Sequence, residues 1–208
     1  DAGLREVIEE EEDYETKRFE FWLLSVLGLF AIFSMFFFCI WGIAFPFKPH
    51  VVVQMLDVNS FYYAQGIDRT GVPTKLMTVN CSVHMSVHNP ATFFRVEASS
   101  SSVNLLYSEI TVGTGEMKKH YQPRKSSGNV TFDVAGKLVP LYGAGDSLPV
   151  AGPQIRVPMT LTFIVRLEGE VVWKLVKMKH SCFVMCLFEI DSVSGESFQF
   201  NNDSCTYR

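Results

Sequence analysis

The sequence lacks the basic clusters and short motifs that mark nucleic-acid-binding proteins and common enzymes. Its 208 residues carry a net charge of −4, and no cluster of Lys and Arg exceeds three residues. Nucleic-acid-binding surfaces are usually strongly basic, so we expect no nucleic-acid partner. The sequence contains no Gly-x-Ser-x-Gly element, and "YGAG", which ends at Gly145, is not followed by the Lys-Ser/Thr of a phosphate-binding loop. We therefore expect no enzymatic activity and no cofactor.

Metal-ligand spacings are missing as well. His84 and His88 stand four residues apart in an alternating segment, and Cys182 and Cys186 have the same spacing in another. Four residues of a strand span about 13 Å, which is too far for two side chains to share one ion. The sequence therefore predicts no metal site.

An uninterrupted apolar run, by contrast, is present near the start of the chain. Residues 21–45 contain no charged side chain, and Pro46 and Pro49 follow them. A helix crosses the bilayer core with about 20 apolar residues, and proline ends a helix. Charged residues precede the run and no small-x-small cleavage pattern follows it. These features predict a retained transmembrane signal anchor at 21–45 rather than a cleaved signal peptide or a soluble core helix.

The charges beside the run predict its orientation. Lys17 and Arg18 precede the run closely, whereas Lys48 alone follows it. The positive-inside rule then places residues 1–20 in the cytoplasm, as an acidic juxtamembrane segment. Either a helix continuous with the span or a disordered tail fits this segment. Because the chain begins at Asp1, we expect a longer N-terminal region to precede it.

Three glycosylation sequons support the same orientation. They begin at Asn80, Asn129 and Asn202, all after the apolar run. In "TVNCSVHMSVH" apolar and polar residues alternate, which places Asn80 on the wet face of a half-buried strand; "NVTFDV" does the same for Asn129. Asn202 lies in a polar stretch. We expect all three to be accessible to glycosylation in an exoplasmic domain.

The region from residue 50 to residue 208 reads as one all-β domain. Short extended runs are separated by turn signals such as Asn89-Pro90, Gly113-Thr114-Gly115 and Glu168-Gly169-Glu170. Seven or eight strands at this spacing are typical of an antiparallel sandwich or barrel. About 160 residues suffice for one domain with its own core.

One segment has no strand pattern. Residues 135–154 are rich in Gly and Pro, and long ordered connections are often functional. We predict a partner-binding loop here, with Leu141, Tyr142 and Leu148 as the apolar groups that a partner would bury. The alternative is that these side chains fold back onto the core as a lid.

Four cysteines lie in the predicted exoplasmic domain, where disulfides form. If residues 192–195 form a four-residue hairpin loop, Cys182 faces Cys205, and we predict this pair as the disulfide. A slip of one residue would instead place phenylalanine side chains opposite each other. Cys81 and Cys186 both occupy inward positions, so they form a possible second pair or remain buried thiols.

The order of several motifs resembles a plant family. Asn89-Pro90, Tyr107 and Tyr121-Gln122 follow the pattern of the late-embryogenesis-abundant group 2 (LEA-2) domain. The chain is similar in particular to the membrane branch related to the harpin-induced and non-race-specific disease-resistance proteins. Ala91 departs from the Asn-Pro-Asn motif of the family. The resemblance implies a fibronectin- or immunoglobulin-like β-sandwich, anchored in the plasma membrane with the C-terminal domain facing the extracellular apoplast.

Two classes of function follow. In the first, the chain is a non-catalytic single-pass membrane protein whose sandwich binds an apoplastic protein or a cell-wall glycan, as the resemblance implies for stress or defence responses. In the second, it is an accessory subunit of a larger integral-membrane complex, such as a polysaccharide synthase or transporter. The lipid bilayer is a partner in both.

Overall fold

The computed structural model of the protein describes residues 2–44, 49–92, 94–148, 156–171, 176–191, 197–201 and 203–208. The chain divides into two compact units, Asp1–Pro46 and Phe47–Arg208, which are treated separately below. Asn202 and the whole of the predicted 192–195 hairpin loop lie outside the described residues.

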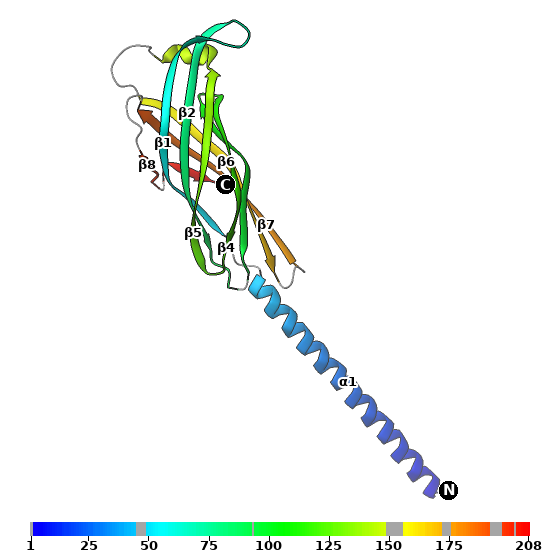
Figure 1. The fold of residues 1–208 in the computed structure, drawn as a ribbon. Helices are drawn as coiled ribbons and strands as arrows, with labels where there is room; N and C mark the ends of the chain where they lie inside the picture. The colour runs from blue at the N-terminus through cyan, green and yellow to red at the C-terminus, as the bar shows by residue number, and fades with distance from the viewer. Residues whose placement is uncertain are drawn as a thin grey trace. The chain divides into compact units, whose positions relative to one another are not determined.

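The first unit is a single helix, α1 (Ala2–Ala44) (Figure 1). Within it, Lys17–Cys39 has a mean hydropathy of 2.3 and no buried residue, so it is long and apolar enough to cross a membrane. The Ser25 hydroxyl donates to the Phe21 carbonyl at 2.8 Å, so this polar side chain inside the apolar run has a hydrogen-bond partner. The helix also covers residues 2–20, so of the two structures considered for the acidic segment the helix is the one observed.

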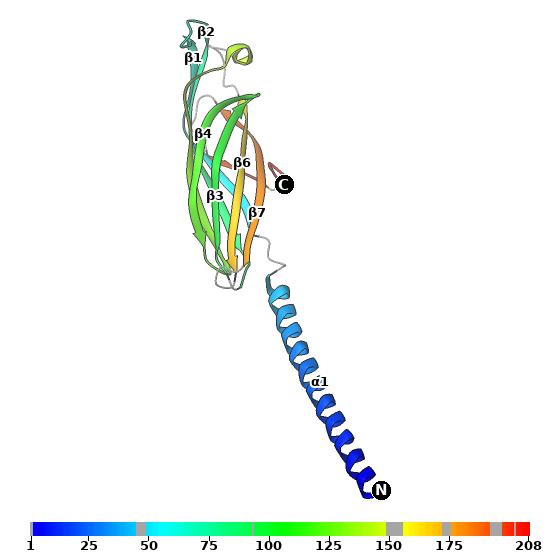
Figure 2. The same ribbon diagram turned by 90° about the vertical axis from the view of Figure 1, so that its right-hand side faces the viewer.

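The second unit is built from antiparallel strands, which confirms an all-β domain preceded by one helix (Figures 1 and 2). Its sheet has nine strands in the order β8-β1-β2-β5-β4-β3-β6-β7-β9, and a short 3-10 helix, η1, follows β5. The elements are β1 (His50–Ile67), β2 (Pro73–Asn89), β3 (Val96–Tyr107), β4 (Ile110–Gln122), β5 (Ser126–Pro140), η1 (Tyr142–Ser147), β6 (Arg156–Val171), β7 (Val176–Asp191), β8 (Ser197–Gln199) and β9 (Cys205–Tyr207).

The sheet folds over into two layers at the junction of β4 and β5. These strands share only the pairs Thr114↔Ala135 and Gly115↔Val134, whereas their other neighbours pair over most of their length. Across the core, the rings of Phe132 on β5 and Phe163 on β6 lie 5.7 Å apart. The side chains between the layers are almost all apolar, so the domain is a sandwich with one hydrophobic core.

Strand β2 follows the alternation that the sequence predicts. Its inward residues are fully buried, while Asn80, Ser82, His84 and Ser86 are partly exposed and His88 is exposed. On β5, Asn129 is exposed and the apolar residues beside it are buried. The inward residues of the two strands are Val79, Cys81, Val83, Met85, Val87, Val130, Phe132 and Val134.

Two of the glycine signals, however, do not mark turns. Gly113 and Gly115 lie inside β4, and Gly169 lies inside β6. A side chain at Gly115 would collide with the backbone of Asp133, and one at Gly169 would collide with the ring of Phe94. These glycines therefore permit close packing within strands rather than chain reversal.

The Asn89-Pro90 signal, by contrast, does mark a turn. The Asn89 side chain is fully buried and donates to the carbonyls of Phe94 at 3.0 Å and Pro123 at 3.1 Å, while its oxygen accepts from the Ala91 N–H at 3.0 Å. One amide thus joins the end of β2 to the β4–β5 turn. This network explains the asparagine without any ligand.

The C-terminal segment corrects the predicted disulfide. After β7 the chain crosses to the far edge of the sheet, where β8 pairs with β1, and it returns to pair with β7 as β9. In this register Cys186 faces Cys205 and the two are bonded. The predicted Cys182–Cys205 and Cys81–Cys186 pairs are therefore wrong. The first assumed that β7 forms a simple hairpin with the segment after it, and the second assumed a bond across the core. Cys81 and Cys182 are free thiols.

Candidate functional site

A groove lies at the end of the sandwich where β1 and β2 are joined, which is the end at which Figure 1 shows η1 beside the β1–β2 turn. Its volume is about 630 Å³. The 18 residues of β1 extend about 55 Å at the usual strand rise, so the groove lies far from His50, where the chain enters the domain. We call it the tip groove; it is lined by residues 67–70, Leu76, residues 137–140 and Tyr142.

The turn that forms one wall is organised by Asp68. Its carboxylate accepts from the N–H groups of Thr70 and Val72 and from the Thr70 hydroxyl, each at 2.8 Å. The Val72 hydrogen bond, followed by that of Thr70, holds the pKa of Asp68 below its ordinary value. Gly71 completes the turn with φ of +90°, a conformation that glycine adopts without strain.

Tyr142 joins the opposite wall to this turn. Its hydroxyl donates to Asp68 at 3.0 Å and its N–H donates to the Thr74 hydroxyl at 2.8 Å. The bond to Asp68 raises the pKa of Tyr142 above its ordinary value. The two walls are therefore held at a fixed separation.

Lys75 on β2 connects this strand to η1 by hydrogen bonds. Its ammonium donates to the carbonyls of Gly145 at 2.8 Å and Leu148 at 2.5 Å. The Leu141 N–H donates to the Lys75 carbonyl at 2.9 Å, so the backbone of the same lysine also takes part. Charge-assisted hydrogen bonds of this kind are stronger than neutral ones, which makes Lys75 the main support of η1.

The three side chains predicted to bind a partner have different positions. Leu141 is 0% exposed and Leu148 is 2% exposed, so both pack into the core and cannot meet a partner. For these two residues the partner-binding prediction is wrong, and the lid alternative holds. Tyr142 is 51% exposed and lines the tip groove. The predicted loop also starts later than expected, because β5 continues to Pro140; residues 149–155 lie outside the described part.

Two residues of the groove have strained backbones. Leu138 has φ of +52° and Tyr142 has φ of +46°. Large side chains rarely adopt such values, and each instance costs about 1–3 kcal/mol. Both side chains are 51% exposed, and Ile67 across the groove is 65% exposed. Leu138 lies at a register shift between β5 and β2, where its N–H donates to the Thr78 hydroxyl at 3.0 Å. The exposed side chains of Leu138 and Tyr142 do not serve the core, which makes them candidates for binding.

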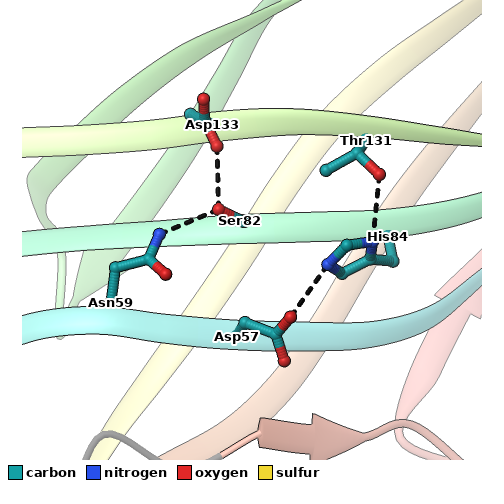
Figure 3. Close-up of polar contacts among 6 residues, drawn as sticks. All are labelled: Asp57, Asn59, Ser82, His84, Thr131 and Asp133. Atoms are coloured by element: carbon teal, nitrogen blue, oxygen red, sulfur yellow. Dashed lines mark hydrogen bonds and ion pairs between the residues drawn. The ribbon is translucent and has the colours of Figure 1, made fainter.

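A polar network covers the outer face of β1, β2 and β5, where Figure 3 shows its side chains in two hydrogen-bonded groups that each cross the three strands. His84 contacts Asp57 at 2.9 Å through Nε2 and Thr131 at 2.9 Å through Nδ1. Beside them, Asn59 donates to Ser82 at 2.8 Å and Ser82 donates to Asp133 at 2.8 Å. The Ser197 hydroxyl on β8, and after it His84, lower the pKa of Asp57.

The Thr131–His84–Asp57 arrangement resembles the order of a hydrolase triad, but its surroundings differ. Thr131 and His84 are direct cross-strand partners on β5 and β2, and Asp57 lies on the next strand, β1, so the three side chains stand on the regular outer face of the sheet and not in a cleft. The network instead consists of cross-strand pairs, which stabilise neighbouring strands. No group of three or more potential metal ligands occurs among the described residues.

Two of the predicted sequon positions flank this polar network. Asn80 is partly exposed on β2 and Asn129 is exposed on β5, both on the outer face. Glycans attached there would cover the polar network.

A second exposed apolar surface lies on the outer face of β6 and β7. Ile164 faces Phe183 across the two strands, and Met185 and Leu187 continue the row along β7. This row is a strip of exposed side chains along two strands, whereas the tip groove is a concavity with walls from several segments, so the tip groove is the better-formed candidate.

Sequence reasoning missed Asp68, Lys75 and Leu138. The Asp68-x-x-Gly71 spacing is a turn signal that identifies the β1–β2 reversal. Neither the lysine bonds nor the positive φ of Leu138 has a sequence signature, because both depend on where β5 ends against β2.

Comparisons with known proteins leave the function open. No protein-family profile and no curated protein matches the chain significantly. Among solved structures, it is similar to a crystal structure of a protein from Archaeoglobus fulgidus, with 10% identity and a TM-score of 0.33. The match covers 69% of this chain and 98% of the other. A likeness at this level supports no statement about function.

Proposed function

We propose that this chain is a non-catalytic single-pass membrane protein that displays its β-sandwich outside the cell and binds a partner protein at the tip groove. The observation that carries the proposal is the pair of exposed, strained residues Leu138 and Tyr142, which face Ile67 across the groove. Backbone strain persists where it serves a function, and rigid scaffolds display their contacts on loops and turns.

Three further features support the orientation. The apolar segment of α1 is long enough to anchor the chain, and Lys17 and Arg18 precede it on the proposed cytoplasmic side. The Cys186–Cys205 disulfide suits an oxidising compartment. Asn80 and Asn129 lie on the outer face of the sandwich, where a glycosyltransferase can reach them.

The resemblance to the LEA-2 family is part of the proposal. It supports a plasma-membrane location and a role in stress or defence responses, with an apoplastic protein as the partner and a cell-wall glycan as the alternative ligand. The tip groove favours the protein, because Ile67 and Leu138 expose apolar side chains in its walls that a partner's apolar side chain can cover.

A second candidate function rests on α1. Along one face of the helix, Val26, Leu29, Phe30, Phe33 and Phe37 repeat at three- and four-residue intervals around a shallow groove. This spacing suits packing against another transmembrane helix, as in an accessory subunit of a polysaccharide synthase or transporter.

Purification from native membranes in mild detergent tests the first function. We expect a partner to co-purify with the wild type and to be lost with Ile67→Ser, which removes a side chain that is 65% exposed and therefore costs little stability. Ile164→Ser, at the exposed row on β6, is the matched control and should retain the partner.

Two results would count against binding at the tip groove. Loss of the partner with Ile164→Ser alone would move the interface to β6 and β7. A polytopic partner that still co-purifies with both variants would favour the accessory-subunit function.

The orientation has its own test. Glycosidase treatment should increase the electrophoretic mobility of the native protein. If protease added outside intact cells removes the N-terminus and spares residues 50–208, the proposed topology is reversed.

A further inference from the structure

The tip groove carries two cations that have no ionic partner in the described part of the chain. Arg69 on the turn and Lys137 on β5 line the groove, are exposed, and form no ion pair with another described residue. The acid of the groove, Asp68, is already engaged by Thr70, Val72 and Tyr142. Two cations therefore face one carboxylate whose oxygens are already occupied, which leaves the groove with an excess of positive charge for a ligand.

The apolar part of the groove is rigid and open. Ile67, Leu138 and Tyr142 are each half or more exposed, and the Tyr142–Asp68 bond fixes two of the walls. At about 630 Å³ the groove has the size of a typical ligand site. A ligand that fills it must combine negative charge with an apolar group of limited length.

This combination favours a peptide over a lipid. A long acyl chain would remain in contact with water along an open groove whose apolar walls are themselves half exposed, so its burial would be incomplete. A peptide needs only one apolar side chain in the groove and a carboxylate beside it. The preformed walls also reduce the ordering cost that an extended peptide meets on binding.

We infer that the tip groove recognises an extended segment of a partner protein in which an Asp or Glu lies next to a large apolar residue. The carboxylate is placed between Arg69 and Lys137, and the apolar side chain lies against Leu138 and Tyr142. This inference rests on the proposed function, because it identifies the kind of partner that the same groove binds.

A displayed library of random heptapeptides, selected on the full chain in nanodiscs, tests the inference. We expect the enriched sequences to share an acidic residue beside Leu, Ile, Phe or Tyr. A synthetic peptide of the enriched sequence should bind at least about tenfold more weakly when its acid is replaced by the corresponding amide, because a charge-assisted contact is lost. Binding should also weaken as salt is raised.

The double variant Arg69→Gln/Lys137→Gln should lose most of the affinity and no longer distinguish the acidic peptide from its amide form. Lys118→Gln/Arg124→Gln makes the same charge change at exposed positions outside the groove and should bind as the wild type does. This pair of variants separates contact at the groove from general electrostatic attraction.

Several outcomes would overturn the inference. They are enriched peptides without an acid, no enrichment at all, equal binding to the two double variants, and groove-dependent binding to vesicles containing phosphatidylserine in place of peptides. If the native partner still requires Ile67 while the peptides show no acid preference, the inference fails and the proposed function stands. If the native partner does not require Ile67, the proposed function itself fails.

Discussion

Replacing Lys75 by methionine should loosen η1 and, with it, one wall of the tip groove. Methionine keeps most of the apolar stem but removes the ammonium that donates to Gly145 and Leu148. A hydrogen bond to a charged group contributes about 1.5–3 kcal/mol in a well-ordered site. Lys75 is only half-buried, so solvent competes for both bonds and we take about 2 kcal/mol for the two together.

Hydrogen exchange measures this loss where it occurs. The N–H groups of Leu141, Ala144 and Leu148 are hydrogen-bonded in or beside η1. A local loss of about 2 kcal/mol should speed their exchange about thirty-fold, while amides in the centre of β2 change far less. If the free energy of global unfolding falls by the same amount, the melting temperature of the domain should fall by about 4–8 °C.

Lys118→Met is the control, because Lys118 is exposed on β4 and should leave both quantities unchanged. Exchange at Leu141, Ala144 and Leu148 that is the same in Lys75→Met and in the wild type would refute the assignment of Lys75 as the support of η1. Equal acceleration across the whole sandwich would refute the local character of that support.

Three further predictions concern the fold. Asn89→Ala removes hydrogen bonds at a fully buried site and should destabilise the domain by about 2–4 kcal/mol, as measured by denaturant unfolding; a loss below about 1 kcal/mol would contradict the network. Non-reducing peptide mapping should recover Cys186 linked to Cys205, and reduction of this bond should cost about 3 kcal/mol; free thiols at both positions would contradict the register. Asp57→Asn should destabilise the domain at neutral pH, because the folded-state pKa of Asp57 is depressed, and the deficit should shrink as pH falls below the ordinary aspartate value of about 3.9; a deficit that persists at pH about 2 would contradict the assignment.

The features that could be predicted from the sequence are those governed by local periodicity. Val79 to Val87 alternate with polar residues, and a strand with one buried face requires such a period of two. The charge-free run at 21–45 is long enough to predict a helix that could cross a membrane, and the structure has a helix of that length and composition there. Asn89-Pro90 marks a turn because both residues restrict the backbone locally.

The features that could not be predicted depend on contacts between distant segments. Gly115 and Gly169 look like turn residues in the sequence, whereas their role is to admit Asp133 and Phe94 from neighbouring segments. The Cys186–Cys205 pair depends on β8 joining β1, more than 130 residues earlier in the chain.

The tip groove is non-local in the same way. Asp68 and Tyr142, which its walls bring into contact, are separated by 74 residues. The Gly- and Pro-rich composition of residues 135–154 identified the region around Tyr142. The burial of Leu141 and Leu148, however, depends on a contact with β2, where the Leu141 N–H donates to the Lys75 carbonyl just after β5 ends. Sequence reasoning therefore found one residue of the groove and not the opposing wall.

The most direct test of binding at the tip groove compares Leu138→Gly with Ser108→Gly for both stability and partner capture from native membranes. Both positions have positive φ, 52° and 54°, but Ser108 lies in the β3–β4 turn, away from the groove. At Leu138, relief of strain offsets the lost half-buried contacts, so stability should stay within about 1 kcal/mol of the wild type while the partner is lost. Ser108→Gly should keep both. A Leu138→Gly protein that captures its partner as well as the wild type does would contradict the account.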